Sequence, residues 1–556
     1  MSTTTMPSSL EIAQAATLRP IDDVADELGL ERDEVEPYGR YKAKVDLSVI
    51  DRLAERPDAK LINVTAITPT PAGEGKTTTS VSLTQGLGKL GRSPVLCLRE
   101  ASLGPVFGVK GGAAGGGYAQ VVPMEDLNLH FTGDLHAITA ANNLLAALID
   151  AHLHHGNAVG LDPLAISWRR CLDMNDRNLR NVITGLGGRA HGAPRETGFD
   201  ITAASEIMGL VAVSRDLADL RERLGRITVG QTYEGEPVTA DDIKAAGAMA
   251  VVLKDAIKPN LVQTLEGQPA FVHCGPFANI AHGNNSLVAD RVGLKLGEYV
   301  ITESGFASDM GMEKFFDITC RIGELRPSAV VLVATVRALK HHGGNLDGGV
   351  AEIEAGAANL ARHIGIVNGF GLQAVVGVNK FPTDTTEELE LVRRLATEAG
   401  AYAAEINTAF ENGGAGATAL AEAAVAAADE PNSFDFAYSL DAPIEEKIRL
   451  IATRVYGADG VDLLPVAKKK AAEWAGTDLA RLPICMAKTH LSLSHDPTLK
   501  NAPTGFTVTV RDLRPYTGAG WIVALCGDMM TMPGLGKAPA AYAIDLDEHG
   551  ETVGLF

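Results

Sequence analysis

Short apolar runs and longer stretches with spaced apolar residues alternate along the first part of the chain. Residues 60–68, KLINVTAIT, are apolar and β-branched over the length of a buried strand. Residues 76–90 carry spaced apolar side chains and end before Gly91, which predicts a helix that stops at the glycine. Residues 93–98, SPVLCL, predict the next strand. The order strand, helix, strand indicates a βαβ unit.

The same alternation continues over the middle of the chain. Residues 135–153 predict a long helix. Four further apolar runs predict strands, at residues 248–253, 299–302, 329–334 and 373–378. Strands that alternate with helices are typical of a mostly parallel sheet covered by helices, so we expect an α/β fold.

The length of the chain predicts more than one domain. At roughly 150 residues per domain, 556 residues correspond to three or four domains. A stretch rich in alanine and glycine at 413–428 and a loop-like stretch at 429–436 mark one boundary, and we place another near residue 360. The expected domains are a large sheet domain, residues 1–360, and two smaller α/β domains, residues 361–435 and 436–556.

Composition and charge exclude several classes of protein. Hydrophobic residues make up 46% of the chain and charged residues 21%, as in folded proteins rather than disordered ones. No apolar run is long enough for a membrane-spanning helix, so no membrane partner is expected. A net charge of -20 argues against nucleic-acid binding, which relies on basic patches. An anionic ligand would therefore need a locally positive site.

The first residues of the chain and its cysteines indicate the cellular compartment in which the protein works. The start, MSTTTMPSSLEIAQAA, has no basic region followed by an apolar core, so we expect no export signal. Six cysteines without a C-x-x-C pair indicate a reducing compartment and no disulfide framework. A cytoplasmic protein whose cysteines are small buried side chains is the expectation.

A possible phosphate-binding loop lies between the first strand and its helix. Its sequence, TPAGEGKT, resembles the P-loop pattern G-x-x-x-x-G-K-[ST], with a threonine where the first glycine usually stands. The glycines would let backbone amides turn toward a phosphate, the lysine would reach its outer oxygens, and the last threonine could offer a hydroxyl to Mg²⁺. The alternative is an ordinary glycine turn, but the strand before it and the helix after it favour a nucleotide site. The predicted nucleotide-binding residues are Thr70, Pro71, Ala72, Gly73, Glu74, Gly75, Lys76 and Thr77.

Two charged residues follow the second predicted strand. Ligands of parallel α/β sheets bind beyond the carboxyl ends of the strands, so Arg99 and Glu100 should face the same crevice as the loop. Arg99 is a candidate clamp for a phosphate or carboxylate, because its planar fork suits both. An ion pair of Arg99 with Glu100 or another acid is the alternative.

Two long strings identify a family. Residues 108–118, GVKGGAAGGGY, are too rich in glycine for a helix or strand, and the lack of serine and the apolar flanks favour a packed loop, with Lys110 adding positive charge, over a flexible linker. Together with residues 333–344, VATVRALKHHGG, this string closely resembles the signatures of the formate–tetrahydrofolate ligase family. Further strings, among them HCGPFANIAHG from His273 and MTMPGLGKAP from Met530, extend the resemblance over essentially the whole chain.

The resemblance implies a specific reaction. The family joins formate to N10 of tetrahydrofolate with ATP, through formyl phosphate, and gives 10-formyltetrahydrofolate, ADP and phosphate. Its main domain is similar to P-loop NTPases. The resemblance further implies Mg²⁺ with ATP, a monovalent cation such as K⁺ or NH₄⁺ as activator, and a homotetramer. By this resemblance, residues 1–360 would bind nucleotide and formate, and residues 361–435 would bind folate.

Other residues take roles that the resemblance implies. Phe381 matches an aromatic residue that stacks on the pterin, and Pro382 keeps Phe381 extended. Phe410 stands where the family pattern W-A-K-G-G has tryptophan, and Asn412 replaces its lysine, which changes the expected folate affinity rather than the reaction. Packing in the core is the alternative for both phenylalanines.

Three carboxylates complete the candidate site. The resemblance places Glu100 and Asp134 near the reacting groups, where either could orient or deprotonate the amine, although Asp134 could instead cap the helix that follows it. Glu303 follows a predicted strand and could bind Mg²⁺ together with Thr77, or could be a solvated loop acid. The catalytic candidates are Lys76, Arg99, Glu100 and Asp134. His341 and His342 lie in the second signature without an assigned role.

Two other functions are considered on the sequence. An ATP-driven switch or partition protein could carry such a loop, but it often has a membrane helix or a DNA-binding surface. A different carboxylate-activating synthetase is the nearer alternative.

Overall fold

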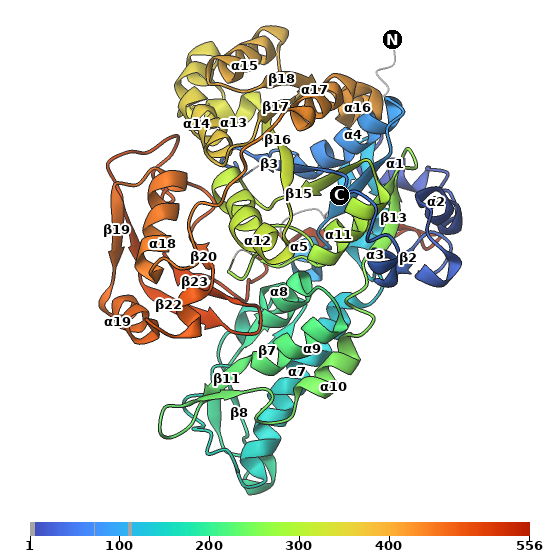
Figure 1. Ribbon diagram of the computed structural model, residues 1–556. Helices are drawn as coiled ribbons and strands as arrows, with labels where there is room; N and C mark the ends of the chain where they lie inside the picture. The colour runs from blue at the N-terminus through green and yellow to red at the C-terminus, as the bar shows by residue number, and fades with distance from the viewer. Residues whose placement is uncertain (1–5, 72, 109–113, 278, 556) are drawn as a thin grey trace.

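A computed structural model describes residues 6–71, 73–108, 114–277 and 279–555. Its centre is a sheet that has twelve strands within these ranges (Figure 1). Seven neighbouring strands of the sheet are parallel. In spatial order these are β14 (Pro269–Val272), β4 (Pro94–Leu98), β15 (Tyr299–Glu303), β3 (Lys60–Ala66), β16 (Pro327–Ala334), β17 (Ala374–Asn379) and β18 (Ala403–Asn407). The mixed α/β class with a mostly parallel sheet is confirmed.

Antiparallel strands extend the sheet beyond β14. β13 pairs with β14, with β2 and with β6, while β1 pairs with β2 and β5 pairs with β6. Their bounds are β1 (Val35–Pro37), β2 (Ala43–Val45), β5 (Gly115–Gly116), β6 (Ala119–Val122) and β13 (Asn260–Thr264). The parallel part therefore holds all the strands whose ends the sequence linked to a ligand.

Helices cover both faces of the sheet. On β3, Leu61 belongs to one hydrophobic core while Ile62 and Val64 belong to the other, as the two-residue repeat of a strand requires. Helices α11 (Leu287–Leu296) and α14 (Val350–Gly369) pack on the first face, and α4 (Lys76–Lys89) and α17 (Thr418–Asp429) pack on the second. This double cover explains why the strands read as continuous apolar runs.

One predicted strand is wrong. Residues 248–253 belong to the helix α10 (Ala246–Leu253). Ala246, Met249 and Leu253 are buried at helical spacing, whereas Val251 is 68% exposed. A short apolar run does not by itself distinguish a strand from a helix segment, and here α10 packs against the neighbouring helix α7 (Asp134–His154).

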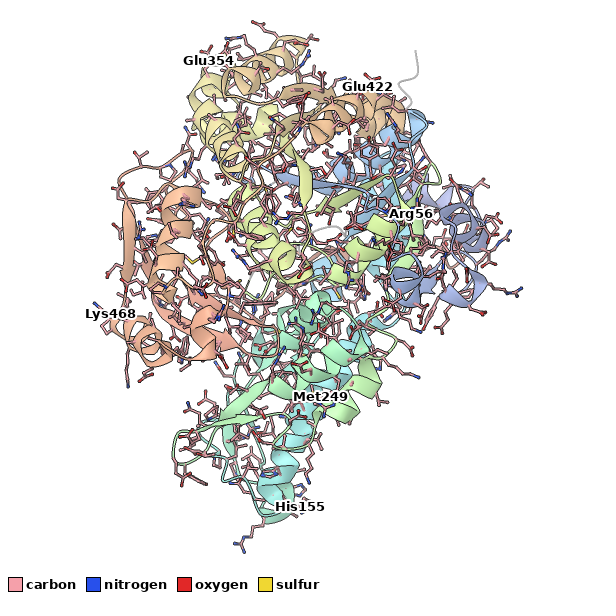
Figure 2. The ribbon with its side chains drawn as sticks, in the orientation of Figure 1. Arg56, His155, Met249, Glu354, Glu422 and Lys468 are labelled. Carbon is pink, nitrogen blue, oxygen red and sulfur yellow. The ribbon has the colours of Figure 1, made fainter. Side chains whose placement is uncertain are left out.

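An arm leaves the sheet domain and has its own core. Helices α7 and α10 pack there with α8 (Glu206–Val213) and α9 (Leu217–Arg226), and the arm's distal end lies near His155 (Figure 2). Short strand pairs complete it: β7 (Arg170–Leu172) with β10 (Phe199–Ile201), β8 (Val182–Thr184) with β9 (Arg195–Thr197), and β11 (Thr228–Gln231) with β12 (Pro237–Thr239).

The C-terminal part lies beside the sheet domain (Figure 1). Its helices are α18 (Ile444–Leu450) and α19 (Pro465–Trp474), and its strands are β19 (Gly460–Leu463), β20 (Ile484–Ala487), β21 (Thr507–Val510), β22 (Asp512–Tyr516) and β23 (Trp521–Leu525). The loop predicted at 429–436 follows the end of α17 as expected. The boundary expected near residue 360 falls within α14, and β17 and β18 extend the central sheet. The division into domains stays a prediction.

Two expectations from composition can be compared with the structure. All six cysteines are buried and none is in a disulfide. Within the described ranges, no helix combines the length and the apolar character needed to cross a membrane.

Candidate active site

A cavity of about 950 Å³ opens at the carboxyl ends of the parallel strands. Residues that follow five different strands line it: Thr70 after β3, Arg99 after β4, Glu303 at the end of β15, Arg337 after β16 and Lys380 after β17. The structure thus brings the loop at 70–77 and the strand-end charges together, as the sequence predicted.

Two glycines of the loop at 70–77 adopt backbone conformations that other residues rarely take. Gly73 has φ +77° and Gly75 has φ +74°, a region that glycine adopts without strain. Helix α4 begins at Lys76 directly after Gly75, which directs the positive end of the helix dipole toward the loop. Every described residue of the loop at 70–77 lines the cavity, and Ala72 lies outside the described residues.

Side chains from helix α13 (Val336–His342) and from the end of β17 hold the loop carbonyls. Arg337 Nη2 donates to the Gly73 carbonyl over 2.6 Å, and Asn379 Nδ2 donates to the Glu74 carbonyl over 2.8 Å and to the Gly75 carbonyl over 3.2 Å. The loop is therefore fixed by polar contacts on its carbonyl side. Neither Arg337 nor Asn379 could be assigned to this task from local sequence.

Hydrogen bonds to Glu74 account for a threonine, rather than a glycine, at the first position of the loop. Its buried carboxylate accepts from the Thr70 amide at 2.8 Å and the Thr70 hydroxyl at 2.7 Å, and from the Thr335 hydroxyl at 2.6 Å. A glycine at position 70 would supply only the amide. Thr70 and Glu74 thus close the loop by an internal contact.

Arg99 forms an ion pair inside the cavity. Its Nη2 lies 3.1 Å from Glu303 Oε1, and the Glu303 side chain is only 4% exposed. The partner is Glu303 rather than Glu100. Arg99 Nε and Glu303 Oε2 are buried and have no hydrogen-bond partner among the described residues. Buried polar atoms are normally satisfied, so these two are candidates for contacts with a ligand.

Glu100 lies next to a second buried charge. Burial, and next the charge of Asp134, raise the pKa of Glu100 well above its usual value. Its Oε2 atom is also buried without a partner within the described part of the chain. The raised pKa makes the Glu100 carboxylate a stronger proton acceptor than an exposed glutamate.

Asp134 is held behind the cavity rather than in it. It is the first residue of α7, whose N-cap is Gly133, so the interpretation of Asp134 as the cap is wrong. Its carboxylate accepts from Lys44 Nζ at 2.7 Å and from Asn260 Nδ2 at 2.7 Å. Asp134 is not among the described residues that line the cavity. Its effect on the site would act through Glu100.

Breaking the Lys44–Asp134 pair is expected to destabilise the fold. The two side chains are 1% and 2% exposed, so Asp134→Asn leaves the Lys44 ammonium buried without a counter-ion. The free energy of unfolding, measured by urea titration, should fall by about 3–5 kcal/mol. As a control, Arg394→Ala breaks an exposed pair with Glu398 and should change it by at most about 1 kcal/mol. An Asp134→Asn variant as stable as this control would contradict the expectation.

The two predicted aromatic residues both reach the cavity. Phe381 and Pro382 line it from the end of β17, and Phe410 lines it from α16 (Ala409–Asn412) with 43% of its surface exposed. The Phe410 carbonyl accepts from the Tyr118 amide at 2.9 Å, beside the glycine-rich segment. Of that segment, residues 109–113, including Lys110, lie outside the described residues.

Two histidines near the site had no role assigned from the sequence. His490 lies in the cavity wall, with its ring centroid 4.8 Å from that of Phe306, although it comes from the C-terminal part of the chain. His342 is buried and its Nε2 donates to the Thr68 carbonyl over 2.9 Å. His342 therefore supports the chain between β3 and the loop at 70–77.

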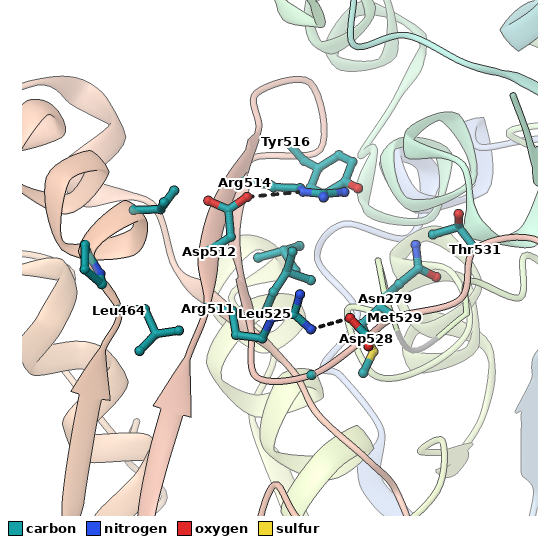
Figure 3. Close-up of a pocket in the computed structure, with 14 residues that line it drawn as sticks. Asn279, Leu464, Arg511, Asp512, Arg514, Tyr516, Leu525, Asp528, Met529 and Thr531 are labelled. Atoms are coloured by element: carbon teal, nitrogen blue, oxygen red, sulfur yellow. Dashed lines mark hydrogen bonds and ion pairs between the residues drawn. The ribbon is translucent and has the colours of Figure 1, made fainter. Parts of the chain in front are cut away.

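A second cavity of about 530 Å³ adjoins the first. Asn279 and Met529 line both cavities. Two ion pairs lie in the wall of the second one, Arg511 with Asp528 and Arg514 with Asp512 (Figure 3). The positive charges of Arg511 and Arg514 in the second cavity are thus each balanced by a neighbouring carboxylate.

Comparison with known proteins decides the family. The family model of formate–tetrahydrofolate ligase matches residues 7–556. Formate–tetrahydrofolate ligase of Desulforamulus reducens is 54% identical over 99% of this chain and all of its own length. The proteins of the same name from Saccharopolyspora erythraea and Cutibacterium acnes are 54% and 55% identical with the same coverage. The chain belongs to the formate–tetrahydrofolate ligase family.

Membership of this family makes the protein a ligase. The resemblance found in the two signatures is thereby confirmed. Within the described residues, no group of three or more His, Cys, Asp or Glu side chains is arranged to hold a metal ion.

Proposed function

We propose that this ligase joins formate to N10 of tetrahydrofolate with ATP, through formyl phosphate, and releases 10-formyltetrahydrofolate, ADP and phosphate. The observation that supports this most is one cavity that contains a phosphate-binding turn, an arginine at a strand end and two aromatic side chains. A nucleotide, a small anion and a flat ring system each have a chemically suitable partner there. The proposal includes a P-loop NTPase-like arrangement of β3, the loop and α4.

In the first step, an oxygen of formate attacks the γ-phosphorus of ATP, and the bond to the bridging oxygen breaks to release ADP. Such transfers depend mainly on positioning and on stabilising charge. Lys76 and the loop amides would bind the phosphates, and Arg99 would orient formate. Thr77 and the unpartnered Glu303 Oε2 would hold Mg²⁺, which supplies further neutralisation of phosphate charge when bound.

In the second step, N10 of tetrahydrofolate attacks the carbon of formyl phosphate. The carbon–oxygen bond to the phosphate breaks, and the phosphate leaves with the oxygen that came from formate. The proton of N10 passes to a base, for which Glu100 is the candidate in the cavity, with Asp134 adjusting its charge state from behind. The segments 108–118 and 273–285, of which residues 109–113 and 278 lie outside the described residues, would keep water from the labile intermediate, either by closing over it or as a static wall.

Local charge allows an acidic protein to bind two anionic substrates. Opposite charges about 4 Å apart gain roughly 4 kcal/mol at an effective dielectric constant near 20, before desolvation. The net charge of -20 is spread over the whole chain and is screened beyond roughly 8–10 Å. Lys76 and Arg99 in the cavity can therefore outweigh it locally.

The proposal also covers the roles of the domains, the activating cation and the assembly of the enzyme. Residues 1–360 would bind nucleotide and formate, residues 361–435 folate, and residues 436–556 would form a C-terminal α/β domain. A monovalent cation, K⁺ or NH₄⁺, would activate the enzyme. The enzyme would work as a cytoplasmic homotetramer, with no nucleic-acid or membrane partner.

The dependence of ADP release on substrates tests the proposed function. ADP should form at a substantial rate only when formate and tetrahydrofolate are both present with MgATP. Turnover that ignores formate would reject the ligation and favour an ATP-driven switch. Turnover with another carboxylate, but not with formate, would favour a different carboxylate-activating synthetase.

Removing the ring of Phe381 is expected to weaken folate binding. Phe381→Ala should reduce the affinity for tetrahydrofolate by about 1–3 kcal/mol, the scale of stacking between an aromatic side chain and a nucleobase. Equilibrium dialysis can measure the change. Tyr402→Ala removes another exposed aromatic ring that does not belong to the described cavity lining, and should leave the affinity unchanged. An unaltered affinity in Phe381→Ala would remove Phe381 from the folate site.

A further inference from the structure

Arg337 connects two parts of the cavity that are distant in sequence. It is the second residue of helix α13 (Val336–His342), which starts directly after β16. Its Nη2 donates to the carbonyl of Gly73 in the phosphate loop over 2.6 Å. Thr335, the N-cap of the same helix, donates to Glu74 over 2.6 Å. The start of α13 is therefore attached to the phosphate loop at two points.

The same arginine lies against the aromatic residue proposed for the pterin. The guanidinium carbon of Arg337 is 4.2 Å from the centroid of the Phe381 ring, within the range of a cation–π contact. The backbone of Phe381 is held separately, since its amide donates to Asp384 Oδ2 over 2.8 Å. Phe381 is thus fixed through its backbone and through one face of its ring.

We propose that Arg337 is a positioning residue that couples the nucleotide loop to the folate site, by holding Gly73 and the Phe381 ring at the same time. Because Arg337 covers one face of Phe381, the pterin stacks on the opposite face. This inference rests on the proposed function, which supplies the two ligands.

The coupling follows from the two contacts of a single guanidinium group. A nucleotide bound to the loop restricts the remaining motion of the Gly73 carbonyl and, through their hydrogen bond, of Arg337. Tetrahydrofolate then meets a Phe381 ring that is already immobilised, so less conformational entropy is lost on binding. By linkage, tetrahydrofolate must strengthen nucleotide binding by the same factor.

The test measures the dissociation constant of tetrahydrofolate with and without a non-hydrolysable ATP analogue. In the wild-type protein, the analogue should tighten tetrahydrofolate binding by about 5-fold or more. In Arg337→Leu this ratio should approach 1, and the affinity without nucleotide should fall by only about 2–5-fold, as loss of a cation–π contact predicts. Arg337→Lys keeps the charge without the planar fork and should give an intermediate ratio.

Controls separate coupling from general damage to the fold. Lys340→Met removes a cation from the same helix, where it pairs with Glu388 at 2.6 Å, and should retain the wild-type ratio. In a Phe381→Leu background, Arg337→Leu should have no further effect on tetrahydrofolate affinity. If Arg337→Leu does not fold, the Arg337→Lys and Phe381→Leu variants still report the ratio.

The outcomes distinguish this inference from the proposed function. A wild-type protein that does not bind tetrahydrofolate contradicts the proposed function itself. A wild-type protein that catalyses the ligation, but shows the same ratio as Arg337→Leu and Arg337→Lys, overturns the role of Arg337 alone. Additive effects of Arg337→Leu and Phe381→Leu would overturn it as well.

Discussion

Lys76→Ala is expected to lower formate-dependent ADP release by roughly 10²–10³-fold, the scale seen when one preorganised charge-stabilising group is removed. Lys76 starts helix α4, directly follows Gly75 and lines the cavity. Under the proposed function, its ammonium group would stabilise the charge on the phosphoryl group during transfer, which depends on positioning and electrostatics.

The effect should be limited to turnover. Lys76→Ala should retain the melting temperature of the wild-type protein within a few degrees, because Lys76 borders a cavity rather than a core. Lys89→Ala is the matched control, since Lys89 ends the same helix, is 50% exposed and pairs with Glu266 at 3.2 Å. Near-normal turnover in Lys76→Ala, or an equal loss in Lys89→Ala, would contradict the assignment.

Arg99→Leu is expected to have the second large effect. The variant loses the planar fork that would orient formate and the formyl phosphate, so formate-dependent turnover should fall by roughly 10²-fold or more. The change also leaves the buried Glu303 carboxylate without its partner at 3.1 Å, and the free energy of unfolding should fall by up to about 3–5 kcal/mol. Steady-state kinetics and urea titration measure the two effects separately.

Arg99→Lys separates the two roles of this residue. A lysine keeps a positive charge near Glu303 but cannot form a bidentate contact, so stability should recover while the KM for formate stays raised by about 10-fold. Arg92→Leu, which breaks an exposed pair with Glu298, is the matched control and should retain wild-type kinetics. Should Arg99→Leu fold and turn over formate normally, Arg99 would have no part in formate binding.

The strands and helices near the loop could be predicted because their signals are local. The apolar run of β3, the two glycines of the loop and the start of α4 lie within a short stretch of sequence, and the structure places them as expected. The strand predicted at 248–253 is wrong because a short apolar run is compatible with either a strand or a helix. Here the residues form helix α10, which packs against α7.

The residues that fix the loop could not be predicted, because their contacts join distant parts of the sequence. Arg337 and Asn379 contact Gly73 and Glu74 across hundreds of sequence positions, and no local pattern records such a contact. A place for Asp134 near the reacting groups followed only from the family resemblance, and its partner Lys44 comes from strand β2, far away in the sequence. The sequence thus identifies the groups that carry charge, while the tertiary structure determines which of them meet.

Transfer of oxygen from formate to phosphate tests the central claim most directly. The wild-type protein would be supplied with ¹⁸O-labelled formate, tetrahydrofolate and unlabelled MgATP, and the inorganic phosphate analysed by mass spectrometry. If the bound nucleotide phosphorylates formate, each phosphate formed should carry one ¹⁸O atom. Unlabelled phosphate alongside formylated tetrahydrofolate would contradict the account.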